Sequence, residues 1–222
     1  MARLREKIDE TQEAGAARRS RKAPRFAPAG QSTQMIIGAD GSTDATIIDT
    51  SARLYGSYRL KRVYYSAFSP IPEASARLPL IKPPLMREHR LYQADWLMRF
   101  YGFDKTEIVA ATDNGMLDLA MDPKLAWSLK HREWFPVDVN KADKERLLRV
   151  PGLGAKVVQK ILQARRYGRL RLEDVGRLCQ SIAKVRPFII AEGWSPTMLT
   201  ESASLPTRLA RPRQLSLFDA AS

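Results

Sequence analysis

Two glycines flanking one leucine form the segment of this sequence best suited to bind an anion. The turn Pro151-Gly152-Leu153-Gly154 lies between two helical patterns, over 141–149 and 155–167. Glycine accepts a left-handed backbone and allows close approach, so the turn can be tight. We expect exposed amide N–H groups at the start of the second helix, where the helix dipole favours negative charge.

Apolar side chains at helical spacing are expected to hold this hairpin together. Asn140 is expected to cap the first helix, and Leu153 is expected to fill the gap between the two helices. The first helix directs Leu147, Leu148 and Val150 inward, and the second directs Val157, Val158, Ile161 and Leu162 inward.

Basic residues are concentrated around this turn. The chain of 222 residues carries a formal net charge of +13. Residues 137–187 hold thirteen basic and five acidic side chains, and residues 1–25 hold eight and four. A clustered excess of this kind predicts a polyanionic partner, whereas a dispersed excess would indicate only a solvated basic surface.

The turn, the apolar spacing and the charge resemble the helix-hairpin-helix family over residues 137–187, with a second hairpin-like half over 167–184. The resemblance implies sequence-independent DNA binding, because phosphate contacts carry no sequence information. The residues implied to contact DNA are Pro151, Gly152, Leu153, Gly154, Lys156, Lys160, Arg165, Arg166 and Arg169, with Arg171 extending the surface. The alternative is a plain helical hairpin that packs against other elements.

The sequence after Trp194 is rich in Ser, Thr and Pro and is expected to be disordered. Near its end, one pentapeptide resembles the bacterial sliding-clamp binding motif at all five positions: Gln214, Leu215, Ser216, Leu217 and Phe218. The resemblance implies binding to the clamp, with the apolar side chains in a pocket and Gln214 as a polar anchor. The alternative is a tail that packs on its own domain.

The first half of the chain predicts a strand, a helix and a second strand. The expected strands span 34–38 and 60–68, and the helix between them spans 43–58, capped by Ser42 or Thr43. This order is typical of a βαβ unit with parallel strands. Parallel sheets normally have both faces covered, so the sheet is either small or the end of a larger barrel.

Helices are also expected over 2–19, 86–101, 105–108 and 122–130, and residues 69–84 are expected to form a linker or a long ordered loop. The expected fold class is α/β plus all-α, a partial βα-barrel remnant followed by a helix-hairpin-helix domain. The expected parts are a basic arm (1–25), the barrel remnant (26–125), the helix-hairpin-helix domain (126–193) and the tail (194–222). The arm ends in the basic run Arg18, Arg19, Arg21, Lys22 and Arg25.

Segments 25–38, 60–72 and 87–103, followed by the hairpin domain, resemble the C-terminal portion of the DNA modification/repair radical S-adenosylmethionine proteins. For the complete family protein, the resemblance implies a partial βα barrel that holds a four-iron four-sulfur cluster and S-adenosylmethionine. It places five residues near the barrel mouth, close to the cofactor: Ser32, Thr33, Gln34, Tyr65 and Ser66. The alternative is that these are ordinary polar residues at strand ends.

The cysteine count departs from that family. Its cluster needs three closely spaced cysteines, and this chain has only Cys179. We therefore expect no cofactor in this chain and no cleavage of S-adenosylmethionine by the chain alone. Either the sequence is a fragment, or its start is misplaced, or the gene is split and an upstream chain completes the barrel.

Two function classes remain open on the sequence. One is the C-terminal part of a radical enzyme that acts on DNA, and the other is a non-catalytic DNA-binding adaptor recruited to the sliding clamp. A nuclease relative ranks last, because no cluster of metal-ligating side chains is visible and Asp138 and Asp143 read as solvated or capping residues. Without an apolar span or signal segment, a cytoplasmic, nucleoid-associated bacterial protein is expected, with no membrane partner.

Overall fold

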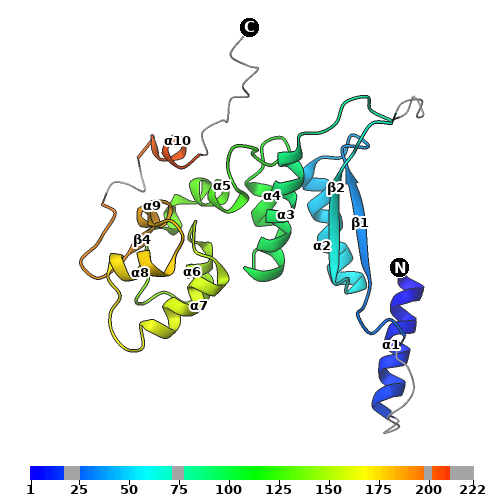
Figure 1. The fold of residues 1–222 in the computed structure, drawn as a ribbon, viewed down its shortest axis with the longest axis horizontal. Helices are drawn as coiled ribbons and strands as arrows, with labels where there is room; N and C mark the ends of the chain where they lie inside the picture. Colours follow the sequence, from blue (N-terminus) through cyan, green and yellow to red (C-terminus); the bar gives the residue numbers. More distant parts are fainter. Residues whose placement is uncertain (18–25, 72–77, 198–201, 211–222) are drawn as a thin grey trace. The chain divides into compact units, whose positions relative to one another are not determined.

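The computed structural model describes residues 1–17, 26–71, 78–197 and 202–210, with side chains omitted at 14–17. It is a mixed structure of helices and small sheets (Figure 1). The chain divides into two compact units, Met1–Asp95 and Trp96–Ser222. This division falls inside helix α3 (Leu85–Phe100), whereas the sequence suggested a boundary after residue 125.

The first unit contains the expected βαβ arrangement. Its elements are α1 (Ala2–Ala17), β1 (Ser32–Ile37), α2 (Asp44–Tyr58), β2 (Arg62–Ala67) and most of α3. The two strands pair in parallel, from Ser32 opposite Arg62 to Ile37 opposite Ala67, which confirms the predicted pairing. The Thr43 hydroxyl accepts a hydrogen bond from the Thr46 amide, so Thr43 is the cap of α2.

One face of this sheet packs against helices α2 and α3. Tyr65 is 2% exposed, and its hydroxyl lies 2.8 Å from the Ser51 hydroxyl of α2. The ring of Tyr92 from α3 meets the Tyr65 ring edge-on, with the centroids 5.1 Å apart. On the opposite face, Ile36 and Tyr64 are about half exposed, at 50% and 44%. Among the residues that the structure describes, the sheet therefore has one covered and one uncovered face.

The two edges of the sheet also differ. The outward-facing amides of β2 belong to Val63, Tyr65 and Ala67, and each donates to a helix side chain. The acceptors are the Tyr55 hydroxyl at 3.0 Å, the Tyr92 hydroxyl at 3.0 Å and the Glu88 carboxylate at 2.8 Å. Side chains from α2 and α3 thus close the β2 edge, because unpaired amides on an edge strand are otherwise open to strand addition.

The second unit is mainly helical. After the end of α3 its helices are α4 (Lys105–Ala110), α5 (Pro123–Lys130), η1 (Arg132–Trp134), α6 (Lys144–Arg149), α7 (Ala155–Ala164), α8 (Leu172–Leu178), α9 (Ile182–Val185), η2 (Arg186–Phe188) and α10 (Leu205–Leu209). The sequence missed its two short strands, β3 (Val137–Asp138) and β4 (Ile189–Ile190), which pair in parallel. This pairing joins the start of the basic segment 137–187 to residues just after its end.

The start of the first hairpin helix corrects one prediction. Helix α6 begins three residues later than expected, at Lys144, and its cap is the Asp143 carboxylate rather than Asn140. The Asn140 side chain instead bonds both backbone groups of Leu170, at 2.8 and 3.1 Å. It cannot also cap α6, because its amide is used in this long-range link.

The segment after Trp194 is not wholly disordered, which corrects a second prediction. Residues Leu205–Leu209 form α10, and Leu205 is only 1% exposed. An Arg132 guanidinium N–H donates to the Ser202 carbonyl at 3.1 Å. The apolar burial of Leu205 explains why this stretch is ordered despite its polar composition.

Among the helices that the structure describes, none is long and apolar enough to cross a membrane.

Candidate nucleic-acid interface

The hairpin predicted from the sequence forms between α6 and α7 (Figure 1). The Leu153 amide donates to the Val150 carbonyl at 3.2 Å, which closes the turn. The Leu153 side chain is 1% exposed, so it fills the hairpin as expected. Val158 and Ile161 of α7 are fully buried. Burial of these apolar side chains holds the two helices at the spacing that the turn requires.

Gly152 is required at its position for two reasons. Its φ is +82°, in the left-handed region that side chains disfavour. A Cβ atom at this position would lie 2.9 Å from Cγ2 of Val185, in α9. Gly154 is different, because its φ is −82° and an added Cβ would meet only the Tyr101 hydroxyl, at 3.6 Å. The first glycine therefore shapes the turn, and the second leaves its outer surface bare.

The amides at the start of α7 are the unpaired hydrogen-bond donors of this turn. Within the described residues, the N–H groups of Gly152, Gly154, Ala155 and Lys156 have no hydrogen-bond acceptor. Gly152 is exposed and Gly154 is partly exposed. Free amides at a helix N-terminus, together with the helix dipole, attract an anion.

Two predicted contact residues do not offer the groups expected of them. The Leu153 amide is occupied by Val150, so it is not available to a phosphate. Pro151 is buried and has no N–H, so it shapes the turn rather than its surface. The Leu153 amide serves turn closure, and the backbone contact of Leu153 with DNA stays a prediction.

The predicted basic residues separate into exposed and engaged groups. Lys156 and Lys160 are exposed one turn apart on α7, and Arg166 is exposed beyond its end. Arg169 is exposed but forms an ion pair with Glu192 at 2.6 Å. Arg165 donates to the carbonyls of Val139 and Ala142, at 3.2 and 2.6 Å, and holds the hairpin to the start of the segment. Arg165 therefore has a structural role within the hairpin, and its contact with DNA stays a prediction.

Sequence reasoning missed two buried cationic side chains next to the turn, Lys124 and Arg149. Lys124 of α5 is 7% exposed and donates to the Leu153 carbonyl at 2.7 Å. Arg149 of α6 is 9% exposed, donates to the carbonyls of Tyr101 and Gly102, and forms an ion pair with Glu107 at 3.0 Å. Neither role has a sequence signal, because the partners of Lys124 and Arg149 are distant from them in sequence.

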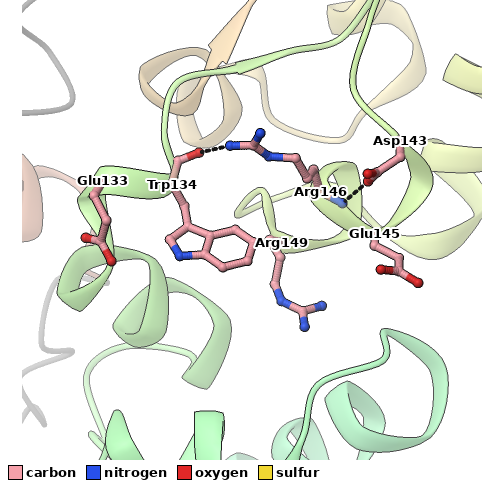
Figure 2. Close-up of a pocket in the computed structure, with 6 residues that line it drawn as sticks. All are labelled: Glu133, Trp134, Asp143, Glu145, Arg146 and Arg149. Atoms are coloured by element: carbon pink, nitrogen blue, oxygen red, sulfur yellow. Dashed lines mark hydrogen bonds between the residues drawn. The ribbon is translucent and has the colours of Figure 1, made fainter.

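A cavity of about 420 Å³ lies on the other side of α6, next to η1. Figure 2 shows its lining, which is Glu133, Trp134, Asp143, Glu145, Arg146 and Arg149. Three carboxylates and two guanidiniums leave the lining without a cationic excess. Asp143 already caps α6, and Arg149 already links α6 to Glu107. The cavity therefore lacks the character of a phosphate site.

The five predicted barrel-mouth residues do not share one face. Ser32, Gln34 and Ser66 lie on the uncovered face, where the Gln34 amide donates to the Ser66 hydroxyl at 2.8 Å. Thr33 and Tyr65 point to the opposite, helix-covered face. Tyr65 is engaged there by Ser51 and Tyr92, and burial raises the pKa of its hydroxyl. Tyr65 therefore belongs to the packing layer beneath the sheet.

The chain does not fit the iron–sulfur cluster of the family it resembles. Cys179 is its one cysteine, at the end of α8 in the second unit, and burial raises the pKa of its thiol. Thiolates hold the irons of such clusters, so one thiol held in its neutral form is unsuitable. In the described ranges, no group of three or more His, Cys, Asp or Glu side chains could hold a metal ion.

Two sequence features lie outside the described residues. They are the pentapeptide Gln214–Phe218 and the basic run from Arg18 to Arg25.

Comparison of the chain with protein-family models, curated proteins and solved structures found no match.

The two glycines should respond differently to alanine. G152A should destabilise the second unit by about 2 kcal/mol, because it combines a left-handed backbone with a clash against Val185. G154A should cost at most about 1 kcal/mol, since its backbone is extended and its surroundings are open. Urea denaturation monitored by tryptophan fluorescence measures the effect, because all four tryptophans lie in the second unit. Equal losses for both variants would contradict this assignment.

Proposed function

We propose that the second unit binds DNA through its phosphate backbone, without reading sequence, at the turn between α6 and α7. The observation that carries this proposal is the set of unpaired amides at Gly154, Ala155 and Lys156, beside the exposed ammonium groups of Lys156 and Lys160. Backbone N–H groups at a helix N-terminus fit one phosphate, and nearby lysines attract the flanking phosphates.

The surrounding charge supports this choice of ligand. The basic segment 137–187 has a net charge of +8, while residues 26–136 have a net charge of only +1. A single small anion would not need so extended an excess, whereas a nucleic acid presents a row of charges. Contacts to phosphate do not distinguish bases, so duplexes of unrelated sequence should bind alike.

The variant A155P tests the amide contact directly. Proline suits the first position of a helix, and the preceding Gly154 has the extended backbone (φ −82°, ψ 160°) that a following proline requires. The variant should therefore fold normally while lacking one N–H donor. We expect about tenfold weaker binding to duplex DNA in fluorescence anisotropy, since a hydrogen bond to a charged group is lost.

Matched variants complete the experiment. A155S keeps the amide and should bind like the wild type. K156A/K160A should reduce the slope of log affinity against log salt by about two, and K82A in the first unit should leave the slope unchanged. A salt-independent affinity, or wild-type affinity for A155P, would refute the proposal.

The carboxyl-terminal pentapeptide supports a second proposal, recruitment of this DNA-binding chain to the bacterial sliding clamp as a non-catalytic adaptor. Its support is the sequence alone, where Leu215, Leu217 and Phe218 stand among polar residues with Gln214 in front of them. Large apolar side chains in such a setting are typical of a short segment that docks in a pocket.

Truncation after Arg213 should abolish capture of the chain by purified sliding clamp. L217A/F218A should have the same effect, because these side chains supply the apolar contact. DNA binding by both variants should stay at the wild-type level, since the hairpin is intact. Retention of the clamp by the truncated chain would end this proposal.

The uncovered sheet of the first unit supports the reading of this chain as the C-terminal part of a radical S-adenosylmethionine protein. In the described part of the chain, the outward amides of β1, at Ser32, Gln34 and Ile36, have no hydrogen-bond partner. Parallel sheets are normally covered on both faces and seldom stop at two strands. We propose that an upstream polypeptide adds strands at the β1 edge and covers this face.

Hydrogen exchange distinguishes the two edges in the isolated chain. The amides of Ser32, Gln34 and Ile36 should exchange fast, and those of Val63, Tyr65 and Ala67 should be protected by their side-chain acceptors. Adding a polypeptide encoded directly upstream and carrying three closely spaced cysteines should protect the β1 amides. Protection of the β1 amides in the chain alone would show that the edge is already covered.

A further inference from the structure

A buried lysine contacts the peptide group at the centre of the proposed phosphate site. Lys124, in the first turn of α5, is 7% exposed, and its ammonium donates to the Leu153 carbonyl at 2.7 Å. Its Nζ also lies 4.8 Å from the centre of the Tyr101 ring. A buried cation without a carboxylate in hydrogen-bond contact is costly, so its position calls for a functional explanation.

The acceptor of this lysine is the other end of an amide in the site. The Leu153 carbonyl and the Gly154 N–H belong to the same peptide group, which is trans. In a trans peptide the C=O and N–H bonds point in opposite directions. With the carbonyl held toward the buried Lys124, the Gly154 N–H must point away from it, and it has no acceptor among the described residues. Donation to the carbonyl also strengthens the N–H as a donor.

Three groups from different elements face the Lys124 ammonium. Asp122 caps the start of α5, Arg149 belongs to α6, and Tyr101 follows the end of α3. Burial lowers the pKa of Lys124 to about 7, Asp122 opposes this shift, and Arg149 adds to it. The Lys124 ammonium is therefore easier to deprotonate than that of an exposed lysine.

We propose that Lys124 is a positioning residue that directs and polarises the Gly154 N–H toward a bound phosphate, and that phosphate binding draws a proton onto Lys124. This inference rests on the proposed DNA binding and adds its regulation by pH. A phosphate on the opposite side of one peptide group stabilises the ammonium form, because a nearby opposite charge favours the charged state of a buried group.

The direction of the effect follows from linkage. A group whose pKa is higher in the complex than in the free protein takes up a proton on binding. Affinity is then greatest at low pH and falls as the pH rises through the pKa of the free protein and then that of the complex. Each unit of increase in the pKa of Lys124 corresponds to about a tenfold loss of affinity across this interval.

The test measures affinity for a duplex from about pH 6 to about pH 8.5 at constant ionic strength. Wild-type protein should lose about tenfold in affinity, and calorimetry in buffers of different ionisation enthalpy should show proton uptake near neutral pH. K124M keeps the length of the side chain but removes its proton and its hydrogen bond, so it should bind weakly and without pH dependence. H131N, which removes the imidazole of the same unit, is the matched control and should keep the wild-type profile.

The outcomes distinguish a failure of the role proposed for Lys124 from a failure of the proposed DNA binding. Wild-type binding that is independent of pH, or a K124M profile that matches the wild type, would overturn the role of Lys124 and leave DNA binding intact. Absence of DNA binding at every pH would instead refute the proposed function. If tryptophan fluorescence shows that K124M does not fold, proton uptake by the wild-type protein decides the question.

Discussion

The left-handed backbone of Gly152 is the constraint on which the hairpin depends. It reverses the chain within a few residues and brings the turn against Val185, with no room for a side chain. Once the chain reverses there, Leu153 enters the gap between α6 and α7, and Gly154 precedes α7 with an amide that has no acceptor among the described residues. The same backbone conformation therefore buries Leu153 and leaves the neighbouring amides unpaired, because successive peptide groups cannot be reoriented independently.

The hairpin could be predicted from the sequence because its determinants are local. The glycine spacing and the helical periodicity of Val158 and Ile161 give the turn, the inward face and the filling leucine. The βαβ unit was visible for the same reason, as a change of period between strand and helix. The strand pairs at Val137 and Ile189 were not, since two residues carry no periodicity and their partners are distant in sequence.

The roles of polar side chains were harder to predict, because they depend on partners that only the fold supplies. Asn140 reads from sequence as a helix cap but instead bonds both backbone groups of Leu170. Arg165 reads as a phosphate contact, and its hydrogen bond to the Ala142 carbonyl could not be foreseen from the sequence. Lys124 gave no signal at all, since nothing near it in sequence distinguishes a buried lysine from a solvated one. Composition identified the basic segment but could not say which of its charges are already engaged.

The unequal edges of the sheet in the first unit limit how it can grow. Tyr55, Tyr92 and Glu88 accept from the three outward amides of β2, whereas the outward amides of β1 have no acceptor among the described residues. As far as the described residues show, a strand can therefore join this sheet at one side only, and two copies that met through β1 would leave no further edge of this sheet exposed. Such pairing would end at a dimer and could not continue into a fibre. Tyr55, Tyr92 and Glu88 therefore protect the sheet against open-ended aggregation through β2.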